Sequence, residues 1–184
     1  MKVRTGDWIQ TRSGVAFYPL DPRPEDVHLE DIAHALSNLC RFSGHCKRFM
    51  SVAEHSVNVS RVVPPEHALQ ALLHDATEAY LVDVPGPIKP MLAGYAEIEA
   101  AVWLAIAERF GVPSALHQSV KDADTAVLLT EKGQLLGPSP GAWLDTEITP
   151  APLGELACMS PREAKYTFLH RFIELAPHER GSAR

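Results

Sequence analysis

The sequence contains little cysteine and no long apolar run. Its 184 residues include three cysteines and no Cys-x-x-Cys pair, which argues against a disulfide framework and against a cysteine zinc knuckle. No window of about 18 apolar residues is free of charge, so a membrane span is excluded. The opening MKVRTGDWIQ also lacks the apolar core of a signal peptide. A reduced, cytoplasmic protein is therefore expected.

The chain has fewer basic than acidic residues. The 17 lysines and arginines against 23 aspartates and glutamates give a formal net charge of −6. Proteins that bind nucleic acid by neutralising phosphates are usually basic, so bulk DNA or RNA is not an expected partner. The chain is 46% apolar and 22% charged, which is typical of a globular protein rather than a disordered one. We expect a single domain over residues 1–184.

Helical periodicity dominates the rest of the sequence. It predicts helices over six ranges: 28–40, 51–63, 65–80, 95–110, 114–131 and 160–176. Local signals mark several of their starts. Ser51 and Glu54 have the spacing of a capping box, Ser114 is expected to cap the fifth helix, and Ser160 with Glu163 opens the last one.

Three segments interrupt the helical pattern. The residues on either side of Arg12-Ser13-Gly14 predict a short β-hairpin with a three-residue turn. Segment 81–94, with three prolines and two glycines, predicts an ordered loop, and segment 133–154 predicts an excursion over the surface. Trp143 in that excursion is either an interface anchor or a packed core aromatic. The expected fold is an all-α bundle of about six helices with a small N-terminal β-hairpin.

The stretch HDATEAYLVDVP places four reactive side chains within ten residues: His74, Asp75, Glu78 and Asp83. It follows the buried-looking run ALQALL, where a charge is unfavourable unless it is paired or bound to metal. Adjacent helix residues point about 100° apart, so His74 and Asp75 can approach one ion from two sides. Glu78 projects over the same cleft. A salt-bridge cluster at a helix end is the alternative explanation.

Further nitrogen and oxygen ligands lie elsewhere in the chain. His55 is on the mostly apolar 51–63 helix, where a lone histidine is commonly a satisfied core residue. Asp122 or Asp124 in VKDADTAVLL supplies another carboxylate, and Asp124 leads directly into an apolar run. Two histidines and two aspartates would suit one divalent transition metal (Co, Mn, Zn, Ni or Fe) better than Mg²⁺.

The order of these residues resembles that of the HD-domain metal-dependent phosphohydrolases. His55, His74-Asp75 and Asp124 occur in that family's order on successive predicted helices. The stretches SVAEHS, LLHDATEAYLVDVPGPIK and VKDAD are similar to those of bacterial 5′-deoxynucleotidases and of compact phage-type enzymes that remove triphosphate from dATP. The motifs span about residues 41–131. The N-terminal hairpin and the 133–154 excursion lie outside the minimal HD core.

The resemblance implies a role for each matching residue. The implied metal ligands are His55, His74, Asp75 and Asp124. Water held by the metal would attack phosphorus. Glu78 would orient or deprotonate that water, and Asp83 would assist protonation of the leaving group. A loop carboxylate before proline can also simply cap a turn, which is the alternative for Asp83.

An anionic substrate needs cations around it, and the candidates are Arg41, Lys89 and Lys121. Arg41 could bind phosphate through two N–H groups, and Lys121 lies three residues before Asp124 and so faces the same side. Phe42 could stack on a base. His45 could contact the sugar or phosphate, or extend the metal site. Core or surface roles are the alternatives for all of these residues.

The expected function is metal-dependent hydrolysis of a nucleotide phosphoester. The substrate is either a (deoxy)nucleoside monophosphate, as for a 5′-nucleotidase, or a dNTP such as dATP, as for a triphosphohydrolase. A catalytically idle nucleotide-binding or sensor module on the same fold is one alternative, and a structural helical protein with a salt-bridge network is another. The resemblance also implies a homo-oligomer.

Overall fold

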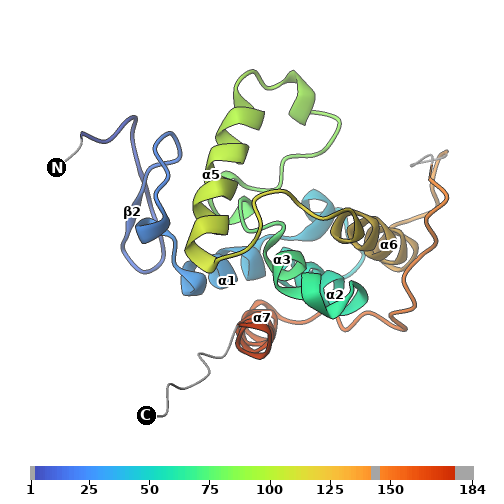
Figure 1. Ribbon diagram of the computed structural model, residues 1–184. Helices are drawn as coiled ribbons and strands as arrows, with labels where there is room; N and C mark the ends of the chain where they lie inside the picture. The colour runs from blue at the N-terminus through green and yellow to red at the C-terminus, as the bar shows by residue number, and fades with distance from the viewer. Residues whose placement is uncertain (1–2, 142–145, 177–184) are drawn as a thin grey trace, which may run out of the picture.

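The computed structural model describes residues 3–141 and 146–176, which are mostly helical with a small antiparallel sheet (Figure 1). The α-helices are α1 (Leu29–Asn38), α2 (Val52–Val62), α3 (Ala68–Leu73), α4 (Glu78–Leu81), α5 (Tyr95–Phe110), α6 (Gln118–Leu135) and α7 (Pro161–Leu175). Short 3₁₀ turns are η1 (Pro24–Asp26), η2 (Arg41–Gly44), η3 (Pro65–His67) and η4 (Lys89–Met91). Within the described ranges, no helix has the length and apolarity needed to cross a bilayer.

Helix α2 is central to the packing. It contacts α1, α3, α6 and α7, and α7 also packs along α1 and α3 (Figure 1). Ile32 and Leu36 of α1, Leu72 of α3 and Phe168 of α7 are fully buried in the main core. Burying an aliphatic or aromatic side chain of this size stabilises a fold by about 1.5–3 kcal/mol. A second apolar cluster joins α2 and α3 to α6.

The N-terminal hairpin forms as predicted. Strands β1 (Ile9–Gln10) and β2 (Ala16–Phe17) pair antiparallel, with Ile9 opposite Phe17. Gly14 has φ of 89°, a left-handed conformation that the turn requires and that glycine adopts without strain. The backbone N–H and the hydroxyl of Ser13 donate to the two carboxylate oxygens of Asp31, at 2.8 and 2.6 Å. These bonds join the turn to α1.

A capping box forms at the start of α7, whereas the one predicted at α2 forms only in part. At α7 the box is complete: Ser160 Oγ accepts from the Glu163 amide, and Glu163 Oε2 accepts from the Ser160 amide. At α2 only half of it forms. Ser51 Oγ accepts from the Glu54 amide at 3.1 Å, but the Glu54 carboxylate accepts the backbone N–H groups of residues 158–159, at 2.9 and 2.7 Å. Glu54 thus connects α2 to the segment leading into α7.

The start predicted for the fifth helix is wrong. Ser114 is not a cap, and α6 begins four residues later, with His117 as its N-cap. Side chains from two other helices bind this segment. The Gln70 amide on α3 donates to the carbonyls of Pro113 and Ala115 at 2.8 and 2.9 Å and accepts from the His117 amide at 3.0 Å. Trp103 Nε1 on α5 donates to the Ser114 carbonyl at 2.5 Å, the group that would accept the first hydrogen bond of a helix capped by Ser114.

The single helix predicted over 65–80 is interrupted. It divides into η3, α3 and α4, with a turn at residues 74–77. His74 Nδ1 lies 2.7 Å from the carbonyl oxygen of Ala71, the group that would accept the Asp75 amide in a continuous α-helix. Several of the following amides bond three residues back, as in a 3₁₀ turn. The interruption falls on the His-Asp pair singled out from the sequence.

The two predicted irregular segments also differ. Residues 82–94 form an ordered loop that includes η4, as expected. The later segment begins only after α6 ends at Leu135, and it is more than a surface excursion. Ala151 is buried and donates its amide to the carbonyl of Ala126 on α6 at 2.9 Å, and Leu156 is buried near the end of α6. Trp143 lies outside the described residues.

Candidate metal centre

Side chains from α2, from the turn after α3, and from α6 converge on one point and form a cluster of four residues: His55, His74, Asp75 and Asp124. His55 Nε2 lies 3.0 Å from Asp124 Oδ1 and 3.6 Å from Asp75 Oδ2. His74 Nε2 lies 3.2 Å from Asp75 Oδ1 and 3.8 Å from Asp124 Oδ1. Ligand atoms about 2.1 Å from one ion lie roughly 3 Å apart. One atom each from His55, His74 and Asp124 lie within 4.8 Å of one another, so these three residues could hold a metal ion.

The hydrogen bonds of the two imidazoles fit a cation. His55 Nδ1 lies 2.7 Å from Glu131 Oε1, and His74 Nδ1 lies 2.7 Å from the Ala71 carbonyl. A carbonyl and an ionised carboxylate can only accept, so each Nδ1 donates, and in the neutral imidazole each Nε2 carries its lone pair toward the cluster. Both Nε2 atoms are buried without a hydrogen-bond partner in the described part of the chain. Such orphaned nitrogens are what metal coordination requires.

The electrostatics of the cluster favour a positive charge at its centre. Burial raises the pKa of Asp124, but the close approach and positive charge of the His55 and His74 rings outweigh it and hold that pKa well below its ordinary value. Burial and Arg41 lower the pKa of His55, yet Glu131 and Asp124 raise it to about 10. A proton and a metal ion compete for the same nitrogens, so metal binding should weaken as pH falls.

Glu131 is a site residue that the sequence analysis missed. It is fully buried on α6, accepts from His55 Nδ1, and forms an ion pair with Arg41 Nε at 3.0 Å. Burial raises the pKa of Glu131, but the charges of His55 and Arg41 outweigh it and lower that pKa. Glu131 lies two helical turns beyond Asp124 and so on the same face of α6. That seven-residue spacing is the signal by which the sequence could have revealed it.

A cavity of about 900 Å³ opens beside the cluster. Predicted site residues that line it are Arg41, Phe42, His45, Asp75, Glu78, Asp83, Lys89 and Asp124. Leu128 and Leu136 add an apolar part to the wall. Lys121 is exposed on α6 and does not line this cavity or either of the two smaller hollows described below. The structure therefore brings together all the predicted residues near the cluster except Lys121.

The Glu78 carboxyl is buried at the cavity wall. Burial, together with the charges of Asp75 and Asp83, raises its pKa to about 9. Its Oε2 has no hydrogen-bond partner among the residues described. Asp83 is half-buried in the loop after α4 and lines the same cavity. The two carboxyl groups are thus close to each other and to the cluster, but they come from different backbone elements.

Strained backbone also gathers at this cavity. Four non-glycine residues in the described ranges have positive φ, and three of them, Phe42, Ser43 and Val82, lie in its wall or directly before Asp83. Val82 has φ of 61° and ψ of 162°, which is unfavourable for a β-branched side chain. Such conformations are concentrated at functional sites, where the surrounding structure holds them in place.

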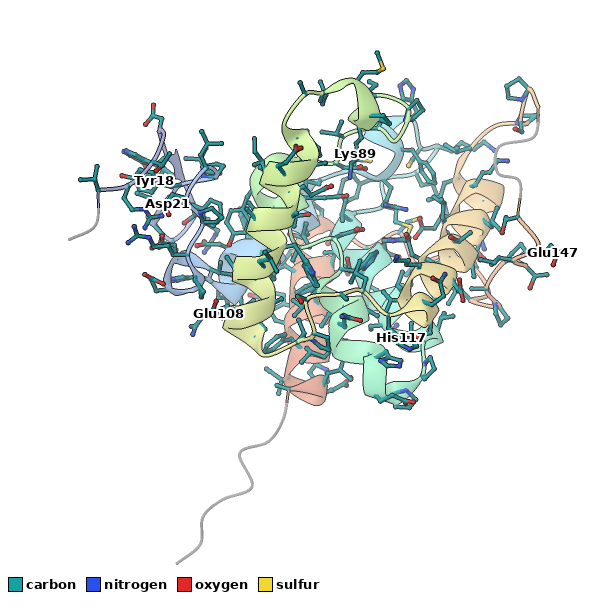
Figure 2. The ribbon with its side chains drawn as sticks, turned by 45° about the horizontal axis from the view of Figure 1, so that its top comes forward. Tyr18, Asp21, Lys89, Glu108, His117 and Glu147 are labelled. Atoms are coloured by element: carbon teal, nitrogen blue, oxygen red, sulfur yellow. The ribbon has the colours of Figure 1, made fainter. Side chains whose placement is uncertain are left out.

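Lys89 lines two hollows that both reach Asp75 and Asp124 of the cluster. It precedes α5 (Figure 2), and its Nζ donates to Glu99 Oε1 at 2.9 Å. It lines both the large cavity and a hollow of about 350 Å³ on the α5 side, where Trp103 and Leu116 form part of the wall. The ion pair with Glu99 partly neutralises Lys89, and Arg41 in the wall of the large cavity is paired with Glu131.

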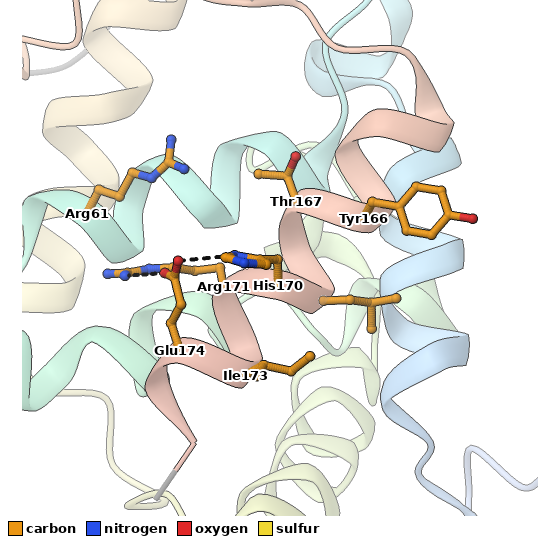
Figure 3. Close-up of a pocket in the computed structure, with 8 residues that line it drawn as sticks. Arg61, Tyr166, Thr167, His170, Arg171, Ile173 and Glu174 are labelled. Carbon is orange, nitrogen blue, oxygen red and sulfur yellow. Dashed lines mark hydrogen bonds and ion pairs between the residues drawn. The ribbon is translucent and has the colours of Figure 1, made fainter. Parts of the chain in front are cut away.

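A third hollow, of about 490 Å³, lies on the outer side of α7 (Figure 3). The carboxylate of Glu174 lies between Arg171 and His170, at 2.9 and 3.0 Å (Figure 3). Arg171 also donates to the Ser60 hydroxyl and carbonyl. This hollow shares no residue with the metal cluster, and the charges of His170, Arg171 and Glu174 pair with one another.

Comparison with known proteins gives relatives whose names state no activity. No family model matches the chain. The chain is 39% identical over 170 residues to the uncharacterized protein YfdR of Escherichia coli, covering 92% of this chain and 96% of the relative. It is 35% identical over 144 residues to the uncharacterized protein RCAP_rcc00048 of Rhodobacter capsulatus, covering 71% of this chain and 74% of the relative. With this identity along almost its whole length, the chain belongs to the family of the uncharacterized protein YfdR.

Proposed function

We propose that this protein is an HD-domain phosphohydrolase that hydrolyses a nucleotide phosphoester with the help of one divalent transition metal. The metal ligands would be His55, His74, Asp75 and Asp124. The observation that carries the proposal is the convergence of these four side chains beside a cavity with Arg41 in its wall. The two imidazole nitrogens without hydrogen-bond partners support a resident cation rather than a set of salt bridges.

The cavity supports a nucleotide as the substrate. Arg41 and Lys89 both line the cavity and supply positive charge for phosphate oxygens. Glu131 takes the Nε–H of Arg41, and the other four guanidinium donors are on the two terminal nitrogens, in the fork that suits a phosphate. Phe42, half-buried in the same wall, offers a ring on which a base could stack.

The carboxylates divide the proton transfers between them. A bound divalent ion would lower the pKa of a water molecule and polarise a phosphoryl oxygen. Glu78 would take a proton from the attacking water. A divalent ion bound by Asp75 would offset the repulsion between Asp75 and Glu78 that contributes to the raised pKa of Glu78. Asp83, on the loop side of the cavity, would assist protonation of the leaving oxygen. The bond between phosphorus and the leaving oxygen breaks as the water oxygen adds to phosphorus.

Two reactions fit this chemistry. A 5′-nucleotidase would release phosphate from a (deoxy)nucleoside monophosphate, and a triphosphohydrolase would release intact triphosphate from a dNTP such as dATP. Both require the same metal ligands and the same phosphate-binding cations. They differ in the products, which chromatography separates.

The test is a panel of deoxynucleoside mono- and triphosphates. The protein is stripped with a chelator and reloaded with Mn²⁺, Co²⁺, Mg²⁺ or Zn²⁺, and the products are resolved by anion-exchange chromatography. We expect turnover with a transition metal and its loss in Glu78→Gln. Nucleotide binding without turnover under every metal would instead indicate an idle binding module. A protein that retains no metal and gains no thermal stability from it would indicate a structural helical bundle.

A further inference from the structure

The mechanism above leaves one buried charge without a role of its own. Glu131 is fully buried on α6, 76 residues along the chain from His55 and 90 from Arg41, and both side chains donate to its carboxylate. Burial of a carboxylate is unfavourable even when it is paired, and replacement of buried ion pairs by apolar residues is often neutral or stabilising. Stability alone therefore gives a weak reason for a carboxylate at this position.

One oxygen of Glu131 acts on the metal cluster through His55. Oε1 accepts the Nδ1–H at 2.7 Å, which fixes the imidazole tautomer and ring orientation, so that the Nε2 lone pair faces Asp124 and Asp75. If the Nδ1–H had no acceptor, the ring could carry its proton on Nε2 instead, and Nε2 could then not bind a cation.

The other oxygen acts on the substrate side. Oε2 accepts Arg41 Nε–H at 3.0 Å, and the Arg41 side chain is only 10% exposed. Arg41 follows Cys40. An isolated β-bridge pairs Cys40 with Ser51, the residue before α2, and so holds this stretch beside the start of α2. With Nε fixed, the guanidinium plane is fixed as well, and so is the direction of its terminal nitrogens relative to the cavity.

We propose that Glu131 is a positioning residue that orients His55 for the metal and Arg41 for the phosphate through its two carboxylate oxygens. The inference rests on the proposed function, because it assigns the phosphate to Arg41. It adds a physical link between the two subsites: a change at Glu131 should weaken metal binding, substrate binding or both, according to which of His55 and Arg41 loses its acceptor.

The test compares Glu131→Gln with Glu54→Gln. His55 and Arg41 face different oxygens of Glu131, so glutamine in the same position accepts from one of them and turns its NH₂ donor toward the other. Glu54 is a matched control: it is also buried, lies next to His55 in sequence, and accepts two backbone N–H groups of the segment before α7 instead of side chains of the site. Each glutamate accepts two hydrogen bonds, and each substitution leaves one of the two donors without its acceptor, so both variants should have a lower melting temperature.

Metal binding is measured without any nucleotide, by calorimetric titration of chelator-stripped protein with Co²⁺. Changes to outer-sphere partners of metal ligands typically weaken metal affinity about 10–100-fold. We expect a loss in that range for Glu131→Gln, or a raised KM at saturating Co²⁺ where the amide oxygen stays on His55. Glu54→Gln should retain the wild-type affinity and KM.

The outcomes separate this inference from the proposed function. Wild-type hydrolysis together with unchanged Co²⁺ affinity and KM in Glu131→Gln would overturn the positioning role and leave the function standing. Weaker Co²⁺ binding in Glu131→Gln, with no nucleotide hydrolysed by wild type, would support the link to His55 and overturn the function. Equal losses in Glu54→Gln would show a general effect of destabilisation and overturn the inference.

A second variant keeps the test usable if Glu131→Gln does not unfold cooperatively. Glu131→Asp retains the charge but is one methylene shorter, so its carboxylate cannot reach both partners at their present distances. The same titration and KM measurement apply. Wild-type values for both quantities in Glu131→Asp would contradict the requirement for a carboxylate that spans His55 and Arg41.

Discussion

Replacement of Asp124 by asparagine tests the metal centre most directly. The sequence leaves Asp122 and Asp124 as alternative ligands, and the structure separates them. Asp124 Oδ1 lies 3.0 Å from His55 Nε2, whereas Asp122 is exposed and accepts from the Gln118 side chain at 2.9 Å. Asp124→Asn keeps the shape of the side chain and removes the anionic ligand. Asp122→Asn makes the same change two residues away on the same helix.

The size of the effect follows from linkage. A metal present at 100 times its Kd stabilises the folded protein by about 2.7 kcal/mol. For a domain of this size, about 1 kcal/mol shifts Tm by 2–4 °C, so the wild type should gain about 5–11 °C. Changes to outer-sphere partners already weaken metal binding about 10–100-fold, and loss of a direct ligand should cost at least the upper value. At about 100-fold weaker binding, the gain falls to about 0.4 kcal/mol, or about 1–2 °C.

The assay is differential scanning calorimetry of chelator-stripped protein, with and without Co²⁺ at that concentration. Wild type and Asp122→Asn should show the full rise in Tm, and Asp124→Asn should show almost none. A full rise in Asp124→Asn, or the loss of the rise in Asp122→Asn, would refute the assignment of the cluster as a metal centre.

Four further substitutions separate chemistry, substrate binding and stability. Glu78→Gln should lower kcat by about 10²–10⁴-fold and leave the Co²⁺-induced rise in Tm intact; retained turnover would remove Glu78 from the reaction. Arg41→Ala should raise KM and lower the free energy of unfolding, measured with urea, by about 3–5 kcal/mol, because the buried Glu131 loses its cationic partner. Arg48→Ala, which breaks an exposed ion pair near the same loop, should lower that free energy by about 1 kcal/mol or less and leave KM unchanged; similar values for the two arginines would contradict the roles given to Arg41. Ser160→Ala removes the cap of α7 and should lower the free energy of unfolding by about 1 kcal/mol without affecting metal affinity, and any loss of Co²⁺ binding would show that the cap is coupled to the site.

Local sequence signals determined much of the secondary structure. The apolar periodicity located the helices, and the Ser160 and Glu163 pattern located the start of α7, because both depend on interactions within a few residues. The hairpin turn was predicted for the same reason. Where a distant side chain competes for the backbone, local signals failed, as at Ser114, where Gln70 holds the segment before α6.

The residues of the candidate site were also predicted only in part from the sequence. The sequence by itself drew attention to His74 and Asp75, since charged side chains beside an apolar run are unfavourable unless they are paired or bound to metal. Its resemblance to the HD-domain family then added His55 and Asp124 as implied ligands. Only the tertiary structure decided how their atoms approach one another and brought the buried Glu131 between Arg41 and His55. Contacts between residues 76 and 90 positions apart depend on the packing of whole helices, and no local pattern in the sequence encodes that packing.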